Sequence, residues 1–392
     1  MQQIHIGLTG LSRAGKTVFL TCAAHAFLDG NGDALREFKF HGWKYSAKIV
    51  SSPEGTARFP YLDYLEGFRK EPPEWPPRTS DDVRELRIRI LFVSDDRRRR
   101  DREIELVFVD YPGERLLDVA LLETDFDDWS DAVWKVLTSR LGSSAATHEF
   151  IHCVRSLERD QRGDVDALQL DAAKARFAAV VRAAHAAKSP IAPIGPILRQ
   201  LQGNEELSSP FFPLNKDDRE RLPHLRKVLR AAYSAYCNKD VRPFLKKIAT
   251  CSHQIVLVDV LDILRSGIPQ FNEVQDQMRR VLECIRQVND GRWAWLMSRW
   301  PFGRPSIRKV SFCATKADQA TGDRRENLAI LLRELFKQAE VALQFGRRDL
   351  RMDFVAFSAH RSTEDVEVQF GGGAVIALRG DAVGQPPGSD CF

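Results

Sequence analysis

A phosphate-binding pattern close to the N-terminus constrains this chain more than any other feature of its sequence. Residues 10–17 read Gly-Leu-Ser-Arg-Ala-Gly-Lys-Thr and match the pattern G-x-x-x-x-G-K-[ST] in full. An apolar run at 4–8 precedes the pattern and a helix-like run at 18–24 follows it, so we expect a strand, a loop and a helix in that order. In that arrangement the backbone N–H groups of the loop and of the helix N-terminus cradle the phosphates of a nucleotide.

The residues of this loop have distinct expected roles. We expect Lys16 to reach the β- and γ-phosphates and the Thr17 hydroxyl to be a ligand of Mg²⁺. A strand–helix turn that matches the pattern by chance is the competing interpretation. The predicted nucleotide-binding residues of the loop are Gly10, Ser12, Arg13, Ala14, Gly15, Lys16, Thr17 and Val18.

Strand-like and helix-like runs alternate along much of the chain. The run at 84–93 alternates polar and apolar residues and, with 104–109, predicts a hairpin around a charged tip. Residues 31–83 are expected to be irregular and rich in proline. The pattern predicts an α/β fold whose mostly parallel sheet gains one antiparallel hairpin strand. The expected strands are 4–8, 84–93, 104–109, 254–260, 310–314 and 352–357, and the expected helices include 18–24, 271–288 and 324–345.

A long helical segment interrupts this alternation. Residues 115–250 are rich in Ala, Arg and Leu and are expected to form an inserted helical subdomain. The flanking regions, 1–114 and 251–370, would together form the nucleotide-binding domain. Residues 371–392 are expected to be a Gly/Pro-rich C-terminal tail.

Two further motifs lie where predicted strands end. Asp110 and Gly113 belong to a D-x-x-G pattern directly after the strand at 104–109. Ligands of α/β sheets bind at the carboxyl ends of the strands, so we expect Asp110 to hold Mg²⁺, mostly through water, and the Gly113 N–H to meet the γ-phosphate. A common turn is the alternative interpretation of this short pattern.

The second motif, Thr-Lys-Ala-Asp at 315–318, is a variant of the guanine signature N-K-x-D. The Asp318 carboxylate would accept hydrogen bonds from guanine N1–H and the N2 amino group, which adenine does not offer together. A site built on such bonds rejects the wrong base strongly. Lys316 would lie over the plane of the base, and Thr315 replaces the usual Asn. Ser358, Ala359 and His360 follow the last predicted strand, where a backbone N–H would meet guanine O6.

In their order and positions these motifs resemble those of the translation-factor-related GTPases. Together with Leu-Leu-Asp at 116–118, they look more specifically like the YcjX-like family of bacterial stress-associated P-loop GTPases. The resemblance covers nearly the whole chain and implies GTP or GDP with Mg²⁺ as ligands. It also implies a helical insertion in the nucleotide-binding domain.

Three residues are candidates for the switch loops. Thr79 is the expected Mg²⁺-binding threonine ahead of the antiparallel strand, with Thr56 as the alternative, although Thr79 could instead cap a turn. Arg78 could balance charge on the transferring phosphoryl group or be solvated. Glu114 stands where many GTPases carry a glutamine that orients the attacking water. A carboxylate there could orient water but would also repel the γ-phosphate, so we expect slow turnover; the alternative is that Glu114 is only a charge on the following helix. The predicted catalytic residues are Lys16, Arg78, Thr79, Gly113 and Glu114, and the predicted metal ligands are Thr17, Thr79 and Asp110.

Residues 292–304 concentrate three Trp and three Arg. This composition fits an interfacial membrane element, a protein-binding surface, or a loop whose aromatic side chains are buried. The first two would give the protein a peripheral contact at the inner membrane or with a membrane-protein partner. Proteins of the resembled family are often encoded beside a predicted membrane protein.

The bulk composition indicates a cytoplasmic globular protein. No apolar run approaches the roughly 20 residues of a membrane-spanning helix, and no signal peptide is expected. The seven cysteines form no C-x-x-C pair, which suggests neither zinc nor disulfides and favours a reducing compartment. The net charge of +4 does not imply nucleic acid, and the arginines at 97–100 lie beside acidic residues in the hairpin tip.

The sequence therefore predicts a slow GTP hydrolase that acts as a nucleotide-dependent switch. Two alternatives stay open. One is a nucleotide-stabilised scaffold with negligible turnover, and the other is a P-loop kinase in which the Thr-Lys-Ala-Asp motif is accidental.

Overall fold

The structure of the 392-residue chain is a computed structural model. It describes residues 1–10, 14–29, 43–71, 73–74, 83–94, 96, 99–111, 113, 115, 118–139, 141–158, 165–186, 210–265, 267, 271–272, 275, 279, 307–344, 350–370, 373–381 and 390–391. The chain divides into two compact units. Met1–Gly113 and Ile248–Phe392 form the first unit, and Glu114–Lys247 form the second.

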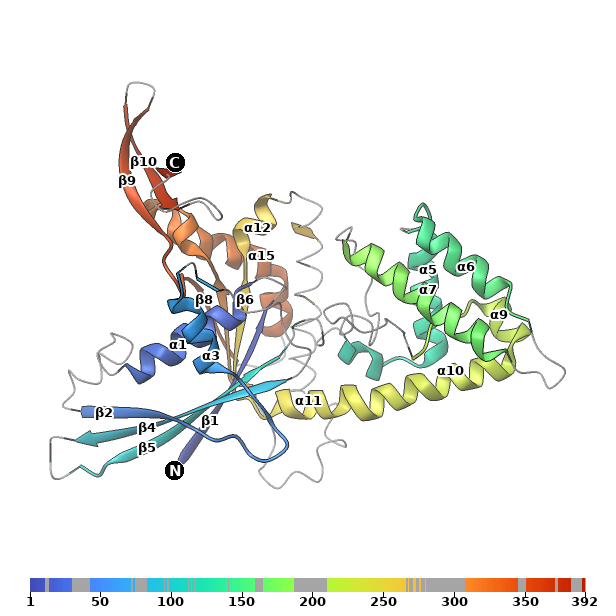
Figure 1. Cartoon of the computed structure of the whole chain (residues 1–392), viewed down its shortest axis with the longest axis horizontal. Helices are drawn as coiled ribbons and strands as arrows, with labels where there is room; N and C mark the ends of the chain where they lie inside the picture. Colours follow the sequence, from blue (N-terminus) through green and yellow to red (C-terminus); the bar gives the residue numbers. More distant parts are fainter. Residues whose placement is uncertain are drawn as a thin grey trace. The chain divides into compact units, whose positions relative to one another are not determined.

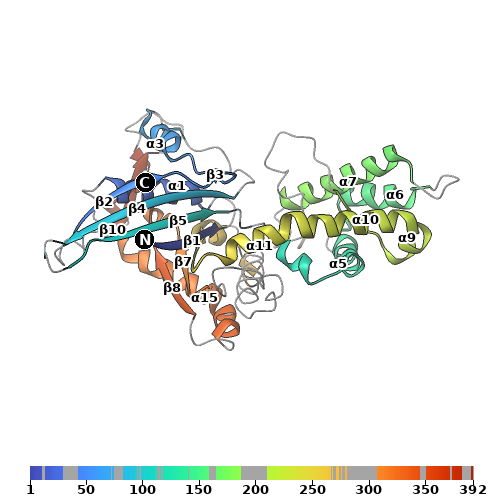
Figure 2. The same cartoon turned by 90° about the horizontal axis from the view of Figure 1, so that it is seen from below.

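A mostly parallel β-sheet is the centre of the first unit (Figures 1 and 2). Its strands follow the order β2-β4-β5-β1-β6-β7-β8, and β3 pairs with β4. The strand β4 runs antiparallel to both β5 and β2, whereas β1, β5, β6, β7 and β8 pair in parallel. The expected α/β fold class is therefore confirmed. The strands are β1 (Gln2–Gly10), β2 (Trp43–Val50), β3 (Ala57–Arg58), β4 (Arg84–Ser94), β5 (Arg102–Asp110), β6 (His253–Val258), β7 (Lys309–Ala314) and β8 (Arg351–Ala356).

Side chains from consecutive strand positions build separate cores on the two faces of this sheet, because successive side chains of a strand point to opposite faces. Cys313 of β7 belongs to a cluster with Leu20 of α1. Its neighbour Phe312 instead stacks on Phe354 and lies 4.4 Å, centroid to centroid, from Phe336 of α15. The regular helices of this unit are α1 (Lys16–Leu28), α3 (Tyr61–Arg69), α12 (Val260–Arg265) and α15 (Arg325–Gln344), with the short 3-10 turns η4 (Ala317–Gln319) and η5 (Gly322–Arg324).

The expectation of an irregular segment at 31–83 is wrong for part of its length, because β2, β3 and α3 lie within it. In β2 the residues Trp43, Tyr45, Ala47 and Ile49 pack against the core cluster, while the residues between them are exposed. This period-2 alternation is the signature of a half-buried strand. The many prolines elsewhere in the segment obscured it.

The C-terminal region forms a second, three-stranded antiparallel sheet. It contains β9 (Thr363–Phe370), β10 (Gly373–Asp381) and β11 (Asp390–Cys391) in the order β11-β10-β9. Two strands therefore lie in the segment 371–392, for which we expected a tail. The apolar run 374–378 of β10 pairs along β9, and the surrounding glycines and prolines hide this run in the composition.

The second unit is helical and has an aromatic core. Trp129 is 1% exposed and packs against the rings of Phe126, Phe177, Phe211 and Tyr233. Among the described residues, no helix in either unit has the length and apolar composition that crossing a membrane requires. The elements are η2 (Asp118–Leu122), α5 (Phe126–Ser139), α6 (Ala145–Arg155), α7 (Ala167–Ala186), α9 (Lys216–Arg221), α10 (Pro223–Tyr236), the π-helical turn η3 (Cys237–Val241) and α11 (Arg242–Ala249), which continues into the first unit.

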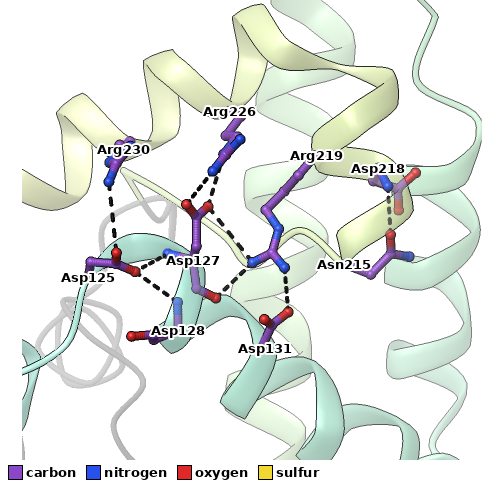
Figure 3. Close-up of polar contacts among 9 residues, drawn as sticks. All are labelled: Asp125, Asp127, Asp128, Asp131, Asn215, Asp218, Arg219, Arg226 and Arg230. Atoms are coloured by element: carbon purple, nitrogen blue, oxygen red, sulfur yellow. Dashed lines mark hydrogen bonds and ion pairs between the residues drawn. The ribbon is translucent and has the colours of Figure 1, made fainter.

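Charged side chains join α5 to α9 and α10 (Figure 3). Arg226 donates to both carboxylate oxygens of Asp127, at 3.0 and 2.5 Å. Arg219 donates to the Asp127 carbonyl at 2.7 Å and to Asp131 at 2.6 Å. The Asn215 side chain caps α9 by accepting a hydrogen bond from the Asp218 N–H. The bonds from the two arginines tie the N-terminal turns of α5 to α9 and α10.

Candidate functional site

The phosphate-binding loop connects β1 to α1, as its pattern requires. Gly10 is the last residue of β1, and a Cβ atom on it would lie 2.7 Å from the Leu257 carbonyl oxygen. Gly15 has a φ of 79°, a left-handed conformation that favours glycine. Lys16 begins α1 and is only 6% exposed, and its Nζ donates to the Gly10 carbonyl at 3.3 Å. The ammonium group therefore lies beside the carbonyl at the end of β1.

The other predicted residues of this loop differ in what the structure describes. Thr17 and Val18 lie in the first turn of α1 and are half-buried, and Ala14 is buried in the core. Ser12 and Arg13 lie outside the described residues. The first turn of α1 presents its N-terminal N–H groups at the end of β1, which is the arrangement that binds phosphate.

The D-x-x-G motif meets the phosphate-binding loop. Leu8 of β1 is in register with Asp110, the last residue of β5. A Cβ atom on Gly113 would lie 2.6 Å from the Gly10 carbonyl oxygen and 3.1 Å from the Thr9 hydroxyl oxygen. Only glycine allows this approach without displacing the backbone. Two motifs about 100 positions apart in the sequence are thus in direct contact at the carboxyl ends of adjacent parallel strands.

Asp110 has the chemistry of a cation ligand. Its Oδ1 atom is buried and has no hydrogen-bond partner among the described residues. Burial raises the pKa of Asp110 above its ordinary value, while the charges of Lys16 and Arg84 act in the opposite direction. A buried carboxylate oxygen without a donor is costly unless a cation or an ordered water satisfies it. Oxygen ligands of this kind suit Mg²⁺, and Thr17 supplies a hydroxyl from the adjacent loop.

The Thr-Lys-Ala-Asp motif follows β7 at the same edge of the sheet. The Thr315 N–H donates to the Val258 carbonyl at 2.9 Å, which fixes the loop against the end of β6. Lys316 has a φ of 58°, the single positive value found for a non-glycine residue in the described part of the chain. Its Nζ forms an ion pair with Asp259 at 2.5 Å. Asp259 directly follows β6, so a carboxylate from the end of the neighbouring strand holds this lysine.

The Asp318 carboxylate is enclosed by hydroxyl groups. Asp318 is 5% exposed. Its Oδ1 accepts from the Ser358 hydroxyl at 2.6 Å, and its Oδ2 accepts from the Ser362 hydroxyl at 2.7 Å and the Ser362 N–H at 3.1 Å. Burial alone would raise the pKa of Asp318, but the hydrogen bonds from Ser358 and Ser362 outweigh it and hold this pKa below its ordinary value. Asp318 is therefore an ionised acceptor at neutral pH.

The segment after β8 lies between this carboxylate and α1. The Phe357 ring contacts the Phe19 ring of α1 at 5.3 Å between centroids, and the Phe357 carbonyl accepts from the Ala317 N–H. Ser358 donates to Asp318 from the next position. Ala359 is half-buried and His360 is exposed. The strand end thus links the Thr-Lys-Ala-Asp motif to α1.

The switch residues are placed only in part. Arg78, Thr79 and Glu114 lie outside the described residues. Thr56, the alternative threonine, immediately precedes β3, whose Ala57 is in register with Arg84 of β4. Arg84 is in turn opposite Asp110, so Thr56 lies at the edge of the sheet where the motifs gather. Residues 292–304 also fall outside the described part of the chain.

Sequence reasoning missed three residues of this site. Asp259 directly follows a buried strand at the ligand-binding edge, and that position could have identified it. Ser362 and Thr363 gave no comparable signal, because they lie beyond the expected S-A-x turn. The Thr363 hydroxyl donates to the Asp318 carbonyl oxygen. All three contact a residue of the Thr-Lys-Ala-Asp motif.

The comparison with known proteins decides the family. The model described as the YcjX-like family, DUF463, matches residues 4–388. The chain belongs to the YcjX-like family. A relative within it, a protein of Escherichia coli K12 named Ras-like GTPase YcjX, is 29% identical over 407 aligned positions, which cover 97% of this chain and 83% of the relative. A Shewanella oneidensis MR-1 protein of the same name is 26% identical and covers 99% of this chain and 84% of that relative.

Proposed function

We propose that this protein binds guanine nucleotide, hydrolyses GTP slowly and acts as a nucleotide-dependent switch. The observation that carries the proposal is the ionised Asp318 carboxylate, held at the sheet edge where the phosphate-binding loop and the D-x-x-G motif meet. A carboxylate at this position would accept hydrogen bonds from the paired N1–H and N2 donors of guanine. The names of the two curated relatives support a GTPase of the Ras-like kind.

The proposed grip on the phosphates uses this chain's backbone and three side chains. The N-terminus of α1 and Lys16 bind the phosphate oxygens, and Lys16 exchanges its bond to the Gly10 carbonyl for bonds to phosphate. Thr17 and Asp110 would hold Mg²⁺, which neutralises charge on the β- and γ-phosphates. The Gly113 N–H meets the γ-phosphate from the turn that contacts Gly10.

Hydrolysis in this proposal is a matter of positioning and electrostatics, with water as the nucleophile. Glu114 would orient that water, and its negative charge would keep turnover slow by repelling the γ-phosphate. Thr79 or Thr56 completes the metal site, and Arg78 balances charge on the transferring phosphoryl group. GTP would order the loops that carry these residues, and hydrolysis would release them.

The nucleotide site is assigned to one of the two units. The first unit, with its mostly parallel sheet, is the nucleotide-binding domain, and the helical second unit is an insertion within it. We also propose a cytoplasmic location. Residues 292–304 would contact a membrane surface or a membrane-protein partner under stress conditions. Sedimentation with anionic vesicles, with and without a GTP analogue, tests that contact.

Two rival functions are compatible with a phosphate-binding loop. A P-loop kinase would phosphorylate a second substrate and would not need the guanine-specific carboxylate. A nucleotide-stabilised scaffold would bind GTP with negligible turnover. Single-turnover hydrolysis of bound GTP, with product analysis, separates the switch from both.

The guanine assignment is tested by Asp318→Asn. We expect the variant to weaken GTP binding by at least about tenfold and to favour xanthosine triphosphate, which presents an acceptor where guanine has its amino donor. Equilibrium binding of GTP, ATP and xanthosine triphosphate to the wild type and the variant measures this exchange. Asp323→Asn is the matched control, because Asp323 lies in the same segment and is exposed. Equal affinity of the wild type for ATP and GTP would disprove guanine selectivity.

A further inference from the structure

The Asp318 carboxylate is already almost fully used by donors of the protein itself. It accepts three hydrogen bonds, one on Oδ1 from Ser358 and two on Oδ2 from Ser362. An ionised carboxylate offers about four lone-pair positions, two on each oxygen. One position is left on Oδ1 and none on Oδ2.

Guanine brings two donors to this carboxylate, the N1–H and the N2 amino group. Together with the three protein donors they exceed the roughly four available positions, so one protein bond has to break. Guanine presents its two donors side by side, one to each carboxylate oxygen. Oδ1 has room for one of them, and it gains a second free position when the single proton of the Ser358 hydroxyl turns to the His360 carbonyl at 2.5 Å. Both positions on Oδ2 are taken by Ser362, so the competition falls on Oδ2. There the Ser362 hydroxyl can leave by rotating about its own side-chain bond, whereas its N–H is fixed to the backbone.

Ser362 is also the attachment point of the C-terminal sheet. It directly precedes β9, whose first residue, Thr363, donates its hydroxyl proton to the Asp318 carbonyl oxygen. Two positions further on, Asp365 Oδ1 accepts from the Gly322 N–H and from Arg325 Nη2, both at 3.2 Å. The start of β9 is therefore bonded at several points to the segment that carries Asp318.

We propose that Ser362 is a specificity-determining residue whose hydroxyl competes with the guanine amino group for Asp318, so that guanine binding loosens the start of β9. The inference rests on the proposed function, because it requires guanine at Asp318. It adds a physical link through which a bound guanine base would change the stability of the β9–β10 hairpin. Inosine, which lacks the amino group, needs only the free position on Oδ1 and leaves Ser362 in place.

The affinities for GDP and for inosine diphosphate (IDP), which lacks the amino group, measure this competition. In the wild type, the second guanine bond is gained only by losing the Ser362 bond, so the preference for GDP over IDP is small. Ser362→Ala removes the competitor and keeps the backbone donor. We expect the ratio of GDP affinity to IDP affinity to rise about fivefold, the net effect of one hydrogen bond.

Two further variants make this result specific. Ser362→Thr retains the hydroxyl and is expected to keep the wild-type ratio. Ser139→Ala, a matched serine-to-alanine control whose hydroxyl bonds within α5, is also expected to leave the ratio unchanged. A merely structural role of Ser362 would change both affinities together and leave their ratio constant, and that result would overturn the inference.

Amide hydrogen exchange tests the link to the hairpin. In the wild type we expect GDP to accelerate exchange at the start of β9, and IDP to leave it unchanged. In Ser362→Ala, GDP is expected to have no such effect. Unchanged exchange on GDP binding to the wild type would overturn the coupling.

The failure of this inference and the failure of the proposed function are distinguishable. If the wild type prefers GDP over ADP but Ser362→Ala leaves the ratio of GDP affinity to IDP affinity unchanged, guanine recognition stands and only the competition is wrong. If the wild type binds ADP as tightly as GDP, both are wrong.

Discussion

At the scale of a single residue, the burial of the Asp110 carboxylate is expected to reduce stability. Burial raises the pKa of Asp110 above its value in the unfolded chain. Folding therefore disfavours the ionised carboxylate, which lowers the free energy of unfolding at a pH above that raised pKa. Asp110→Asn should therefore raise the melting temperature of the nucleotide-free protein at pH 7 by a few degrees, roughly 1 kcal/mol of unfolding free energy. This gain should disappear as the pH falls through the raised pKa, because the wild-type carboxyl then becomes neutral.

The same variant should lose its advantage when ligand is present. Mg²⁺ with GDP should stabilise the wild type more than Asp110→Asn, since the variant has lost a carboxylate ligand. Thermal melts across pH, with and without Mg²⁺ and GDP, measure both effects. If Asp110→Asn is less stable than the wild type without nucleotide at neutral pH, the buried Asp110 carboxylate is not a source of instability and the prediction is wrong.

The ion pair between Lys316 and Asp259 makes a second prediction at this scale. Asp259→Asn removes the charge that holds the lysine and should weaken GDP binding about three- to tenfold, with little effect on folding, because Lys316 is 37% exposed. Titration with a fluorescent GDP analogue measures the loss. Asp353→Asn is the control, since it breaks a pair of the same length with Lys309, which is the first residue of β7, away from the carboxyl ends. Equal losses of GDP affinity in both variants would show that Asp259 has no specific role in nucleotide binding.

At the scale of elements, the charged contacts between α5 and α10 should stabilise the helical unit modestly. The hydrogen bond from Arg226 lowers the pKa of Asp127, so its contribution is present at neutral pH and is lost as the pH falls through that lowered pKa. Arg226 is 42% exposed, so Arg226→Ala should cost about 0.5–1 kcal/mol of unfolding free energy at pH 7. Urea unfolding at pH 7 and near pH 3 measures the cost and its disappearance.

The control for this helix contact is Lys337→Ala in α15, which removes an exposed pair with Glu334. We expect a smaller effect, below about 0.5 kcal/mol. A loss from Arg226→Ala that is independent of pH would show that packing of the arginine stem, rather than its charge, stabilises the contact.

At the scale of the whole molecule, the two units have separate cores. Calorimetry should therefore resolve two unfolding transitions. Mg²⁺ with GDP should raise the transition of the sheet unit, and Arg226→Ala should lower the other, because ligand binding stabilises only the unit that holds the site. A single transition that shifts as a whole in both experiments would show that the units unfold together.

How much of this could be predicted from the sequence depended on the range of the interactions involved. The phosphate-binding loop was predictable because Gly10, Gly15 and Lys16 lie within one strand–helix turn. The alternation of strand-like and helix-like runs indicated the α/β fold. β7 and β8 were also predictable, because each contains a short apolar run, although only β7 is buried. β2 was missed, since its single buried face leaves only a weak alternation among prolines and charged residues.

The sequence by itself determined the class of fold, the family resemblance and the motifs that follow β1, β5, β7 and β8. Only the tertiary structure decided which of their atoms meet. Three contacts join residues more than 40 positions apart: Gly113 with Gly10, Asp259 with Lys316, and Ser362 with Asp318. Such contacts depend on strand order and register, which place the ends of parallel strands at one edge and leave no periodic trace in the chain.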